Sequence, residues 1–192
     1  MVDKEKIAQA VRLILEAIGE DPGRPGLAET PERVARFYEE ACSGIGRRAR
    51  DVVKILTLEN YDEMVLVRDI PFASLCEHHL VPFLGRAHVA YLPHRRVVGI
   101  SKLARVVEAY AKRLQLQEKL TAQIANTINE VLQPRGVAVI IEAQHQCMTT
   151  RGIHKPGVSM VTSRMLGAFR NDPSTRRELL AMVGRSTVTG ID

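Results

Sequence analysis

The sequence predicts an α+β domain in which antiparallel strands carry a helix pair on one face, preceded by an N-terminal helical appendage. Apolar residues recur at helical spacing in two segments near the start and two near the middle, and β-branched or alternating stretches flank the middle pair. The resulting order of helices and strands lacks the strict alternation of a doubly wound sheet. The 192 residues suffice for one sizeable domain with a smaller appendage.

Two helices are expected to open the chain. The first ends near Gly19, and its apolar face consists of Ile7, Val11, Ile14, Leu15 and Ile18. The second has Thr30 as its N-cap and Pro31 at its first helical position, and it ends at Gly44. Its apolar stripe consists of Val34, Phe37, Tyr38 and Ala41.

Strands are expected after the basic link 46–50, which we interpret as a solvated connection rather than a binding patch. Three strands are predicted, punctuated by proline and glycine, over 64–70, 73–84 and 85–93. A helix pair follows, marked by Leu103, Val106, Val107 and Tyr110, and then by Leu120, Ile124, Ile128 and Val131. The remaining elements are strands over 137–147 and 159–169 and a helix over about 174–183. We therefore divide the chain into a helical region, 1–50, and a larger domain, 51–192.

The net charge of +5 and the pI of about 9.3 suit an anionic partner. Aromatic residues are only 4% and tryptophan is absent, so the base-stacking surface of a nucleic-acid-binding protein is not expected. The N-terminal segment mixes charged and apolar residues, unlike a secretory signal, and no apolar run reaches membrane-spanning length. Nucleic acid is therefore the weaker option, and composition does not choose between an acidic surface and a phosphorylated small molecule.

Three cysteines make a poor disulfide framework, and they favour a reducing cytoplasm. Cys42 lies on the stripe of the second helix and is interpreted as a small buried residue. Cys76 and His79 stand in a C-x-x-H spacing that a turn can bring onto one ion. These residue types are those that zinc prefers.

The predicted strand over 137–147 supplies further donors. Successive strand side chains alternate, so His145 and Cys147 are expected on one face. Two cysteines and one histidine would hold zinc with an open fourth position, and we predict Cys76, His79 and Cys147 as the ligands. The other two histidines, His78 and His145, would move protons near neutral pH.

A closed structural site is the alternative that spacing leaves open. If His79 and His145 both bound the ion with the two cysteines, the tetrahedron would be complete and open-site chemistry would be lost. A C-x-x-H pair alone is also a weak signal, because buried free cysteines are common.

Several long blocks resemble the GTP cyclohydrolase I family, which converts GTP and water to 7,8-dihydroneopterin triphosphate and formate. They extend from about residue 26 to 169 and read GLAETPERVARFY, CEHHLVPFLGRAHVAYLP, GISKLARVVEAYAKRLQLQEKLTAQI and EAQHQCMTTRG. The resemblance implies a zinc-activated water that opens the guanine imidazole ring, followed by ribose rearrangement and ring closure. It also implies zinc on Cys76, His79 and Cys147, which agrees with the open site.

The resemblance implies further roles for individual residues. The catalytic set would be His78, His145 and Ser101. Gln117 and Glu118 would read the guanine, and the ribose and phosphates would meet Ser101, Lys102, Arg105, Arg151 and Arg33. Physically, Ser101 and Lys102 open a predicted helix, whose free N–H groups favour an anion.

The family has the tunnelling fold, and similar enzymes form a homodecamer of two pentamers with active sites between subunits. By resemblance, 51–192 is then the catalytic domain, and Arg33 would come from a neighbouring subunit. Two other functions remain open: a related tunnelling-fold pterin or deazapurine enzyme that releases no formate, and a non-catalytic zinc-stabilised module that binds nucleotides.

Overall fold

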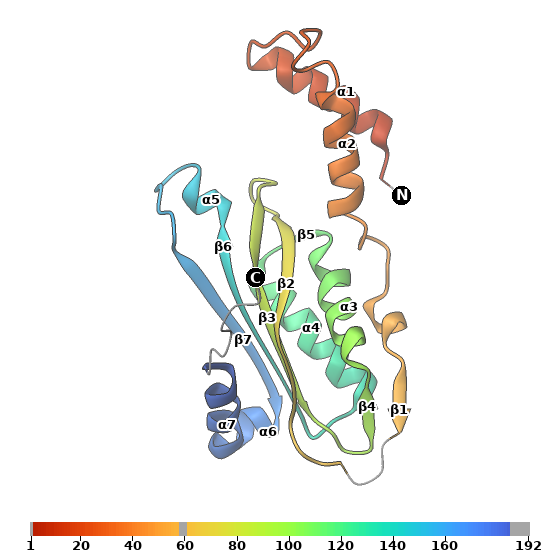
Figure 1. Ribbon diagram of the computed structural model, residues 1–192, viewed down its shortest axis with the longest axis vertical. Helices are drawn as coiled ribbons and strands as arrows, with labels where there is room; N and C mark the ends of the chain where they lie inside the picture. Colours follow the sequence, from red (N-terminus) through yellow and green to blue (C-terminus); the bar gives the residue numbers. More distant parts are fainter. Residues whose placement is uncertain (1, 58–60, 185–192) are drawn as a thin grey trace, which may run out of the picture.

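The computed structural model describes residues 2–57 and 61–184, and their helices and strands confirm an α+β fold (Figure 1). Residues 58–60 and 185–192 of the predicted 51–192 domain lie outside the described residues. No helix in the described part of the chain is long and apolar enough to cross a membrane. The elements are α1 (Lys4–Ala17), α2 (Thr30–Ala41), η1 (Ala49–Val52), β1 (Ile55–Thr57), β2 (Val65–Cys76), β3 (Pro82–Leu92), β4 (Arg96–Val98), α3 (Ile100–Ala111), β5 (Leu114–Gln115), α4 (Gln117–Leu132), β6 (Gly136–His145), α5 (Gln146–Thr149), β7 (Ser159–Gly167), α6 (Ala168–Asn171) and α7 (Pro173–Gly184).

The main sheet has the order β5-β2-β3-β6-β7. Its four long strands pair antiparallel, and the two-residue β5 runs parallel to the end of β2. A separate ladder joins β1 to β4. The sheet therefore brings the end of β2, the start of β3 and the end of β6 together at one end of the strands. Cys76, His145 and Cys147 lie there, and we call this end of the sheet the cysteine edge.

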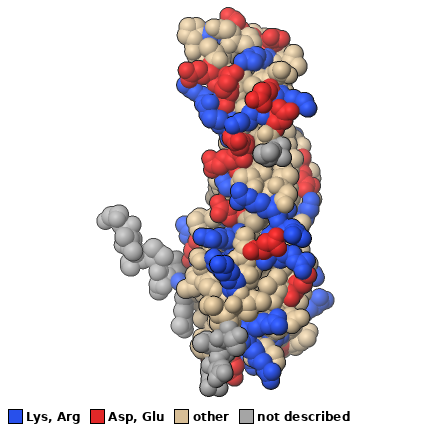
Figure 2. Space-filling model, turned by 90° about the vertical axis from the view of Figure 1, so that its right-hand side faces the viewer, with Lys and Arg blue, Asp and Glu red and all other residues tan. Residues whose placement is uncertain are grey.

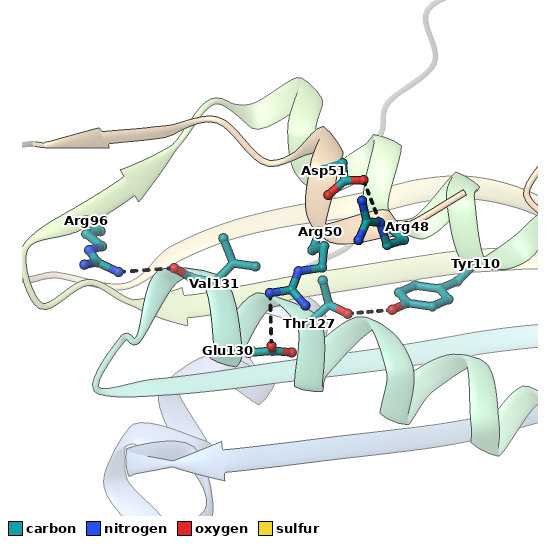
Figure 3. Close-up of polar contacts among 8 residues, drawn as sticks. All are labelled: Arg48, Arg50, Asp51, Arg96, Tyr110, Thr127, Glu130 and Val131. Atoms are coloured by element: carbon teal, nitrogen blue, oxygen red, sulfur yellow. Dashed lines mark hydrogen bonds and ion pairs between the residues drawn. The ribbon is translucent and has the colours of Figure 1, made fainter. Parts of the chain in front are cut away.

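The helix pair α3 and α4 packs on one face of this sheet, as predicted. Apolar residues at helical spacing on both helices meet the inward residues of the strands; the fully buried ones include Val106, Val107, Leu120, Ile124, Val89, Tyr91 and Ile141. The Tyr110 hydroxyl lies 2.6 Å from the Thr127 hydroxyl and joins the two helices (Figure 3). This packing holds α4 against α3 and the sheet.

The opposite face of the sheet is covered at one end by α6 and α7. Phe169 and Leu179 pack there against Ala90 and Ala138. The predicted last helix is confirmed, and the Asp172 carboxylate accepts hydrogen bonds from the N–H groups at its start. Helices thus lie on both faces, with the larger core under α3 and α4.

The N-terminal helices α1 and α2 pack on each other beyond one end of the sheet (Figure 1). Both helices were predicted, but the expected apolar face of α1 is not uniformly buried: Leu15 is buried, whereas Ile14 and Ile18 are exposed. The N-cap of α2 is Glu29 rather than Thr30, without a side-chain cap bond.

The link before η1 lies against the helix pair. Arg48 pairs with Asp51, and Arg50 pairs with Glu130 of α4 at 3.7 Å (Figure 3). The Arg113 guanidinium donates to the carbonyls of residues 44 and 47. Arg48 and Arg50 therefore have partners inside the chain, as expected of a connecting segment.

The prediction of three strands over 64–70, 73–84 and 85–93 is wrong in its boundaries. Two strands, β2 and β3, cover this stretch and are joined by a turn over 77–81. Pro71 lies within β2. At this position β2 pairs with β3 but not with β5, so the missing N–H of proline leaves no hydrogen bond unmade on that side. Gly85 also lies within β3 and does not separate two strands. Glycine suits this position because a Cβ there would clash with the backbone of Glu142 and the side chain of Ala143.

The expectation that Cys147 lies on a strand face is also wrong. The β6 strand ends at His145, which pairs with Phe83 near the start of β3. Beyond that point β3 offers no partner, and the chain turns into the short helix α5, which contains Cys147. The turn of α5 instead brings the Cys147 side chain close to Cys76 and His145.

Candidate metal and nucleotide site

The turn between β2 and β3 holds the first set of predicted site residues. The N–H of Cys76 donates to the carbonyl of Val81, and the N–H of Leu80 donates back to Cys76. Leu80 adopts a left-handed backbone with φ of 57°. This tight return leaves Cys76 buried at the strand end while His78 and His79 are exposed.

Three ligand-type side chains converge at this edge: Cys76 from β2, His145 from β6 and Cys147 from α5. Their ligating atoms all lie within 4.8 Å of one another, and both cysteines are free. Two sulfurs and an imidazole nitrogen are the donor set that zinc prefers. The group could therefore hold a metal ion.

Burial, together with the neighbouring Cys76, raises the pKa of the Cys147 thiol. Without a cation, two adjacent thiolates would repel each other in a poorly solvated place. A divalent ion would remove that cost, because it binds the deprotonated sulfurs. The chemistry of the pair therefore fits a metal better than it fits two free thiols.

His145 is held on two sides. Its ring stacks on Phe83 with the centroids 4.6 Å apart and the planes 1° from parallel. Its Nε2 lies 2.7 Å from Oε1 of Gln117. Burial lowers the pKa of His145, and the nearby Glu118 carboxylate opposes that shift. A neutral imidazole therefore stands between the cysteines and the first turn of α4.

Gln117 and Glu118 begin α4 but face different surroundings. Glu118 is exposed, whereas the side chain of Gln117 is buried, with 1% of its surface accessible. The Gln117 amide contacts His145 and the strands β6 and β7. The structure therefore brings both predicted guanine-reading residues to the cysteine edge, but only Glu118 is open to solvent.

His79 lies on the same turn as Cys76 but outside the close group, which contains His145 instead. The Arg151 guanidinium donates to the His79 ring, and the His78 and His79 rings meet edge to face with centroids 6.3 Å apart. The structure thus places His78, His79 and Arg151 around the group formed by Cys76, His145 and Cys147.

The predicted phosphate residues Ser101, Lys102 and Arg105 lie elsewhere. They occupy the first turns of α3, which follows β4, whereas the other end of α3 leads through β5 to the cysteine edge. Arg105 lines a hollow of about 290 Å³ with Arg47 and Lys112. Figure 2 shows basic side chains gathered over the middle and lower parts of the face that carries β1 and α3.

Arg33 is also distant from the cysteine edge along the chain. It lies in the first turn of α2 and pairs with Glu29 at 2.5 Å. The chain therefore collects the predicted metal and guanine residues at one edge of the sheet, and leaves the predicted phosphate cations Lys102, Arg105 and Arg33 on other surfaces.

Sequence reasoning missed two residues that shape the site. Phe83 was interpreted only as part of a strand, yet it stacks on His145. Lys119 pairs with Glu77 at 2.8 Å and links the turn after Cys76 to the start of α4. An aromatic residue soon after the histidine pair was the available signal for Phe83, whereas the Lys119 contact depends on tertiary packing.

Known proteins resemble this chain over almost all its length. The family model for GTP cyclohydrolase I matches residues 7–184. GTP cyclohydrolase 1 of Thermoanaerobacter pseudethanolicus is 58% identical over 184 residues, covering 95% of this chain and 98% of that protein. The Bacillus subtilis protein of the same name is 55% identical over 185 residues, covering 96% and 97%.

One solved structure is a more distant match. The crystal structure of the archaeosine synthase QueF-Like in the apo form is 19% identical, with a TM-score of 0.46. It covers 54% of this chain and 93% of its own. That likeness is too weak to argue from.

Proposed function

The chain belongs to the GTP cyclohydrolase I family, whose reaction converts GTP and water to 7,8-dihydroneopterin triphosphate and formate, and on that premise we propose how its residues divide the work. The observation that carries the proposal is the convergence of two cysteines and His145 beside the start of α4. This edge can hold a Lewis acid, a proton carrier and a guanine-reading carboxylate together.

We assign the metal as zinc. Cys76 and Cys147 would hold it through their sulfurs, with His79 as the third ligand on the grounds of spacing and resemblance. His79 is three residues from Cys76 along the chain, and its ring accepts a hydrogen bond from Arg151. When bound, zinc supplies the Lewis acidity that makes water a nucleophile near neutral pH.

His145 and His78 would move the protons. The lowered pKa of His145 favours a neutral ring that accepts a proton and then returns it to a guanine ring nitrogen. Glu118 would accept hydrogen bonds from the guanine ring N–H and exocyclic amine, for which a carboxylate is the natural partner. Because Glu118 lies beside His145, it would turn the imidazole ring of the guanine toward the two cysteines.

The triphosphate would meet cations from other chains. Ser101 and Lys102 sit at the opposite end of α3 from the cysteines, with Arg105 one turn further along, and a helix of twelve residues is about 18 Å long. A single chain therefore separates the two halves of the predicted site. An assembly that places the start of one chain's α3 beside the cysteine edge of another would join them, which supports a homo-oligomer; we propose the homodecamer of two pentamers from the resemblance.

Arg151 and Arg33 complete the proposed cradle. Arg151 already lies beside His79, so it would reach the phosphates from the cysteine edge. Arg33 is exposed on α2 and would come from a further subunit. Guanidinium groups bind phosphate oxygens through paired N–H donors, which suits both positions.

The remaining assignments follow from the family. We propose the tunnelling fold for the catalytic domain, 51–192, with the helical region 1–50 as its appendage. Three free cysteines suit a reducing cytoplasm.

The test of the mechanism uses the zinc-loaded protein with GTP. Formate and, after oxidation, fluorescent neopterin should appear together in equal amounts. His78→Ala and His145→Ala should each slow neopterin formation strongly while zinc content stays near the parent value. If either variant kept the parent rate, the assignment of that histidine would be wrong; loss of zinc from His145→Ala but not from His79→Ala would make His145 the third ligand.

A further inference from the structure

A buried polar network lies under His145 and contains side chains from α4 and β7. Gln117 and Thr121 are each 1% exposed. Buried polar groups in folded proteins are almost always hydrogen-bonded, so the donors and acceptors here must match. That requirement fixes which atoms carry the protons.

The orientation of the Gln117 amide is determined by two backbone carbonyls. Its Nε2 lies 3.1 Å from the carbonyl oxygen of Ile141 and 2.9 Å from that of Met160. A carbonyl oxygen only accepts, so the atom facing both must be the NH₂ group. Oε1 of Gln117 then points the other way, and it too can only accept.

This orientation fixes the proton on His145. Oε1 of Gln117 lies 2.7 Å from Nε2 of His145. Because Oε1 cannot donate, Nε2 must carry a hydrogen. A neutral imidazole has one such hydrogen, so Nδ1 is the nitrogen with a free lone pair.

Two threonines stabilise the arrangement. The Thr121 hydroxyl donates to the backbone carbonyl of Gln117 at 2.7 Å. Its hydrogen is thereby used, so the contact of 2.7 Å between Thr121 and Thr162 requires Thr162 to donate. Oγ1 of Thr162 in turn lies 3.1 Å from Nε2 of Gln117 and can accept from it. The two hydrogens of the Gln117 NH₂ group thus face three acceptors, and no contact of the network sets two donors or two acceptors against each other.

We infer that Gln117 is a positioning residue, which holds His145 in the neutral tautomer protonated at Nε2 and leaves Nδ1 as its working atom. The inference rests on the proposed function for its catalytic consequence, but the tautomer itself is a property of the folded chain. It differs from a role in reading guanine, because the Gln117 amide is engaged on both sides within the chain.

The consequence for His145 is directional. A proton or a metal ion can reach its lone pair only at Nδ1, since Nε2 is occupied by Gln117. Without Gln117 both tautomers would be populated, and part of the protein would present an N–H where a lone pair is needed. Loss of a partner that orients a site histidine typically lowers metal affinity or activity about 10- to 100-fold.

The kinetic experiment compares two replacements of Gln117 with a matched control. Gln117→Met keeps the length and removes both amide groups, and it should lower kcat about 10- to 100-fold with little change in KM for GTP. Gln117→Glu keeps an oxygen that accepts from Nε2, and its second oxygen must be protonated to donate to the carbonyls of Ile141 and Met160. In that form it should retain more of kcat than Gln117→Met. Gln9→Met makes the same replacement at an exposed position of α1 and should leave kcat near the parent value. A raised KM with unchanged kcat in Gln117→Met would instead make Gln117 a guanine contact and overturn the inference.

The second experiment observes the tautomer directly and does not depend on activity. Solid-state ¹⁵N NMR of histidine-labelled protein separates protonated from unprotonated ring nitrogens, and comparison with His145→Gln assigns the signals of His145. We expect protonated Nε2 and unprotonated Nδ1 in the metal-free and the zinc-loaded protein, and a mixture in Gln117→Met. Protonated Nδ1 in the parent would overturn the inference even if the variants fail to fold. A parent that showed the expected tautomer but released no formate would reject the proposed function alone.

Discussion

The two ends of α3 lie beside opposite kinds of chemistry. At its C-terminal end, β5 joins the edge of β2, and the cysteines, His145 and the start of α4 gather in a partly buried group. At its N-terminal end Ser101 is exposed, and the exposed Arg105 lies one turn further along, in a hollow that also contains Arg47 and Lys112. Strand pairing within the chain assembles the group at the C-terminal end of α3, whereas the residues at the N-terminal end are exposed to solvent.

The difference fits the proposed division of the site between chains. Metal and guanine groups need distances that are fixed closely, and a sheet edge provides them because its strands are held in register. Phosphate cations tolerate looser placement and screening, so they can come from a surface that meets another chain. The predictions below test this division.

The largest effect is expected at the cysteine end. Cys147→Ser removes one sulfur from the group of three, so zinc content should fall to near zero and formate release should fall to background. Metal analysis of the purified variant together with the formate assay checks this. Cys42→Ser is the matched control, since Cys42 lies in the N-terminal helical region, and it should keep its zinc. An active, zinc-free Cys147→Ser would contradict the metal site.

Mixed assemblies test whether the two ends of α3 meet across chains. Cys147→Ser and Lys102→Ala should each be nearly inactive alone, because each lacks one half of every site. Random mixing during coexpression would leave about a quarter of the sites with both halves intact if they come from different chains. Formate release by the mixed oligomer measures this restoration. No restoration would mean that both halves belong to one chain.

The division between the ends was only partly predictable from the sequence. Helical spacing predicted α3 and α4 because amphipathic periods are local, and the cysteine and histidine spacing predicted a metal site. The sequence did not predict that β2 continues through Pro71 and β3 through Gly85. The first depends on the absence of β5 beside Pro71, and the second on the close approach of Ala143 to Gly85. The contact between Gln117 and His145 joins residues 28 positions apart and arises only from packing.

A moderate effect is expected at Glu118, which belongs to the cysteine end but is exposed. Glu118→Gln keeps the size and loses the charge that, in the proposed function, would accept from the guanine N–H groups. Hydrogen bonds to charged groups contribute about 1.5–3 kcal/mol, so kcat/KM for GTP should fall about 10- to 100-fold while zinc is retained. Lys119→Gln, one residue away and facing Glu77, should have a smaller effect. Equal losses in the two variants would argue against guanine reading.

The smallest effect is expected away from both ends, at His88 on the outer face of the sheet. His88 is 9% exposed, and its Nδ1 accepts from the N–H of Asp69 at 3.3 Å. Burial lowers the pKa of His88; Asp69 and Glu142 oppose the shift, while Arg68 and Arg86 add to it. The folded chain therefore binds this proton less readily than the unfolded chain does.

The sign of the pH dependence follows from that difference. Stability from neutral His88 is fully present above about pH 6.5, the unfolded value, and it is lost as the pH falls through the lower folded pKa. His88→Asn keeps an acceptor near Asp69 and does not titrate, so on acidification its Tm should fall less than the Tm of the parent. The difference between the two falls should be about 2–4 °C, the change expected for about 1 kcal/mol in a chain of this length. Thermal unfolding of the parent and the variant between pH 7.5 and about pH 5.5 measures the difference. Parallel curves would show that His88 does not titrate there, and unchanged GTP turnover in His88→Asn at pH 7.5 would confine its role to stability, in contrast to His145.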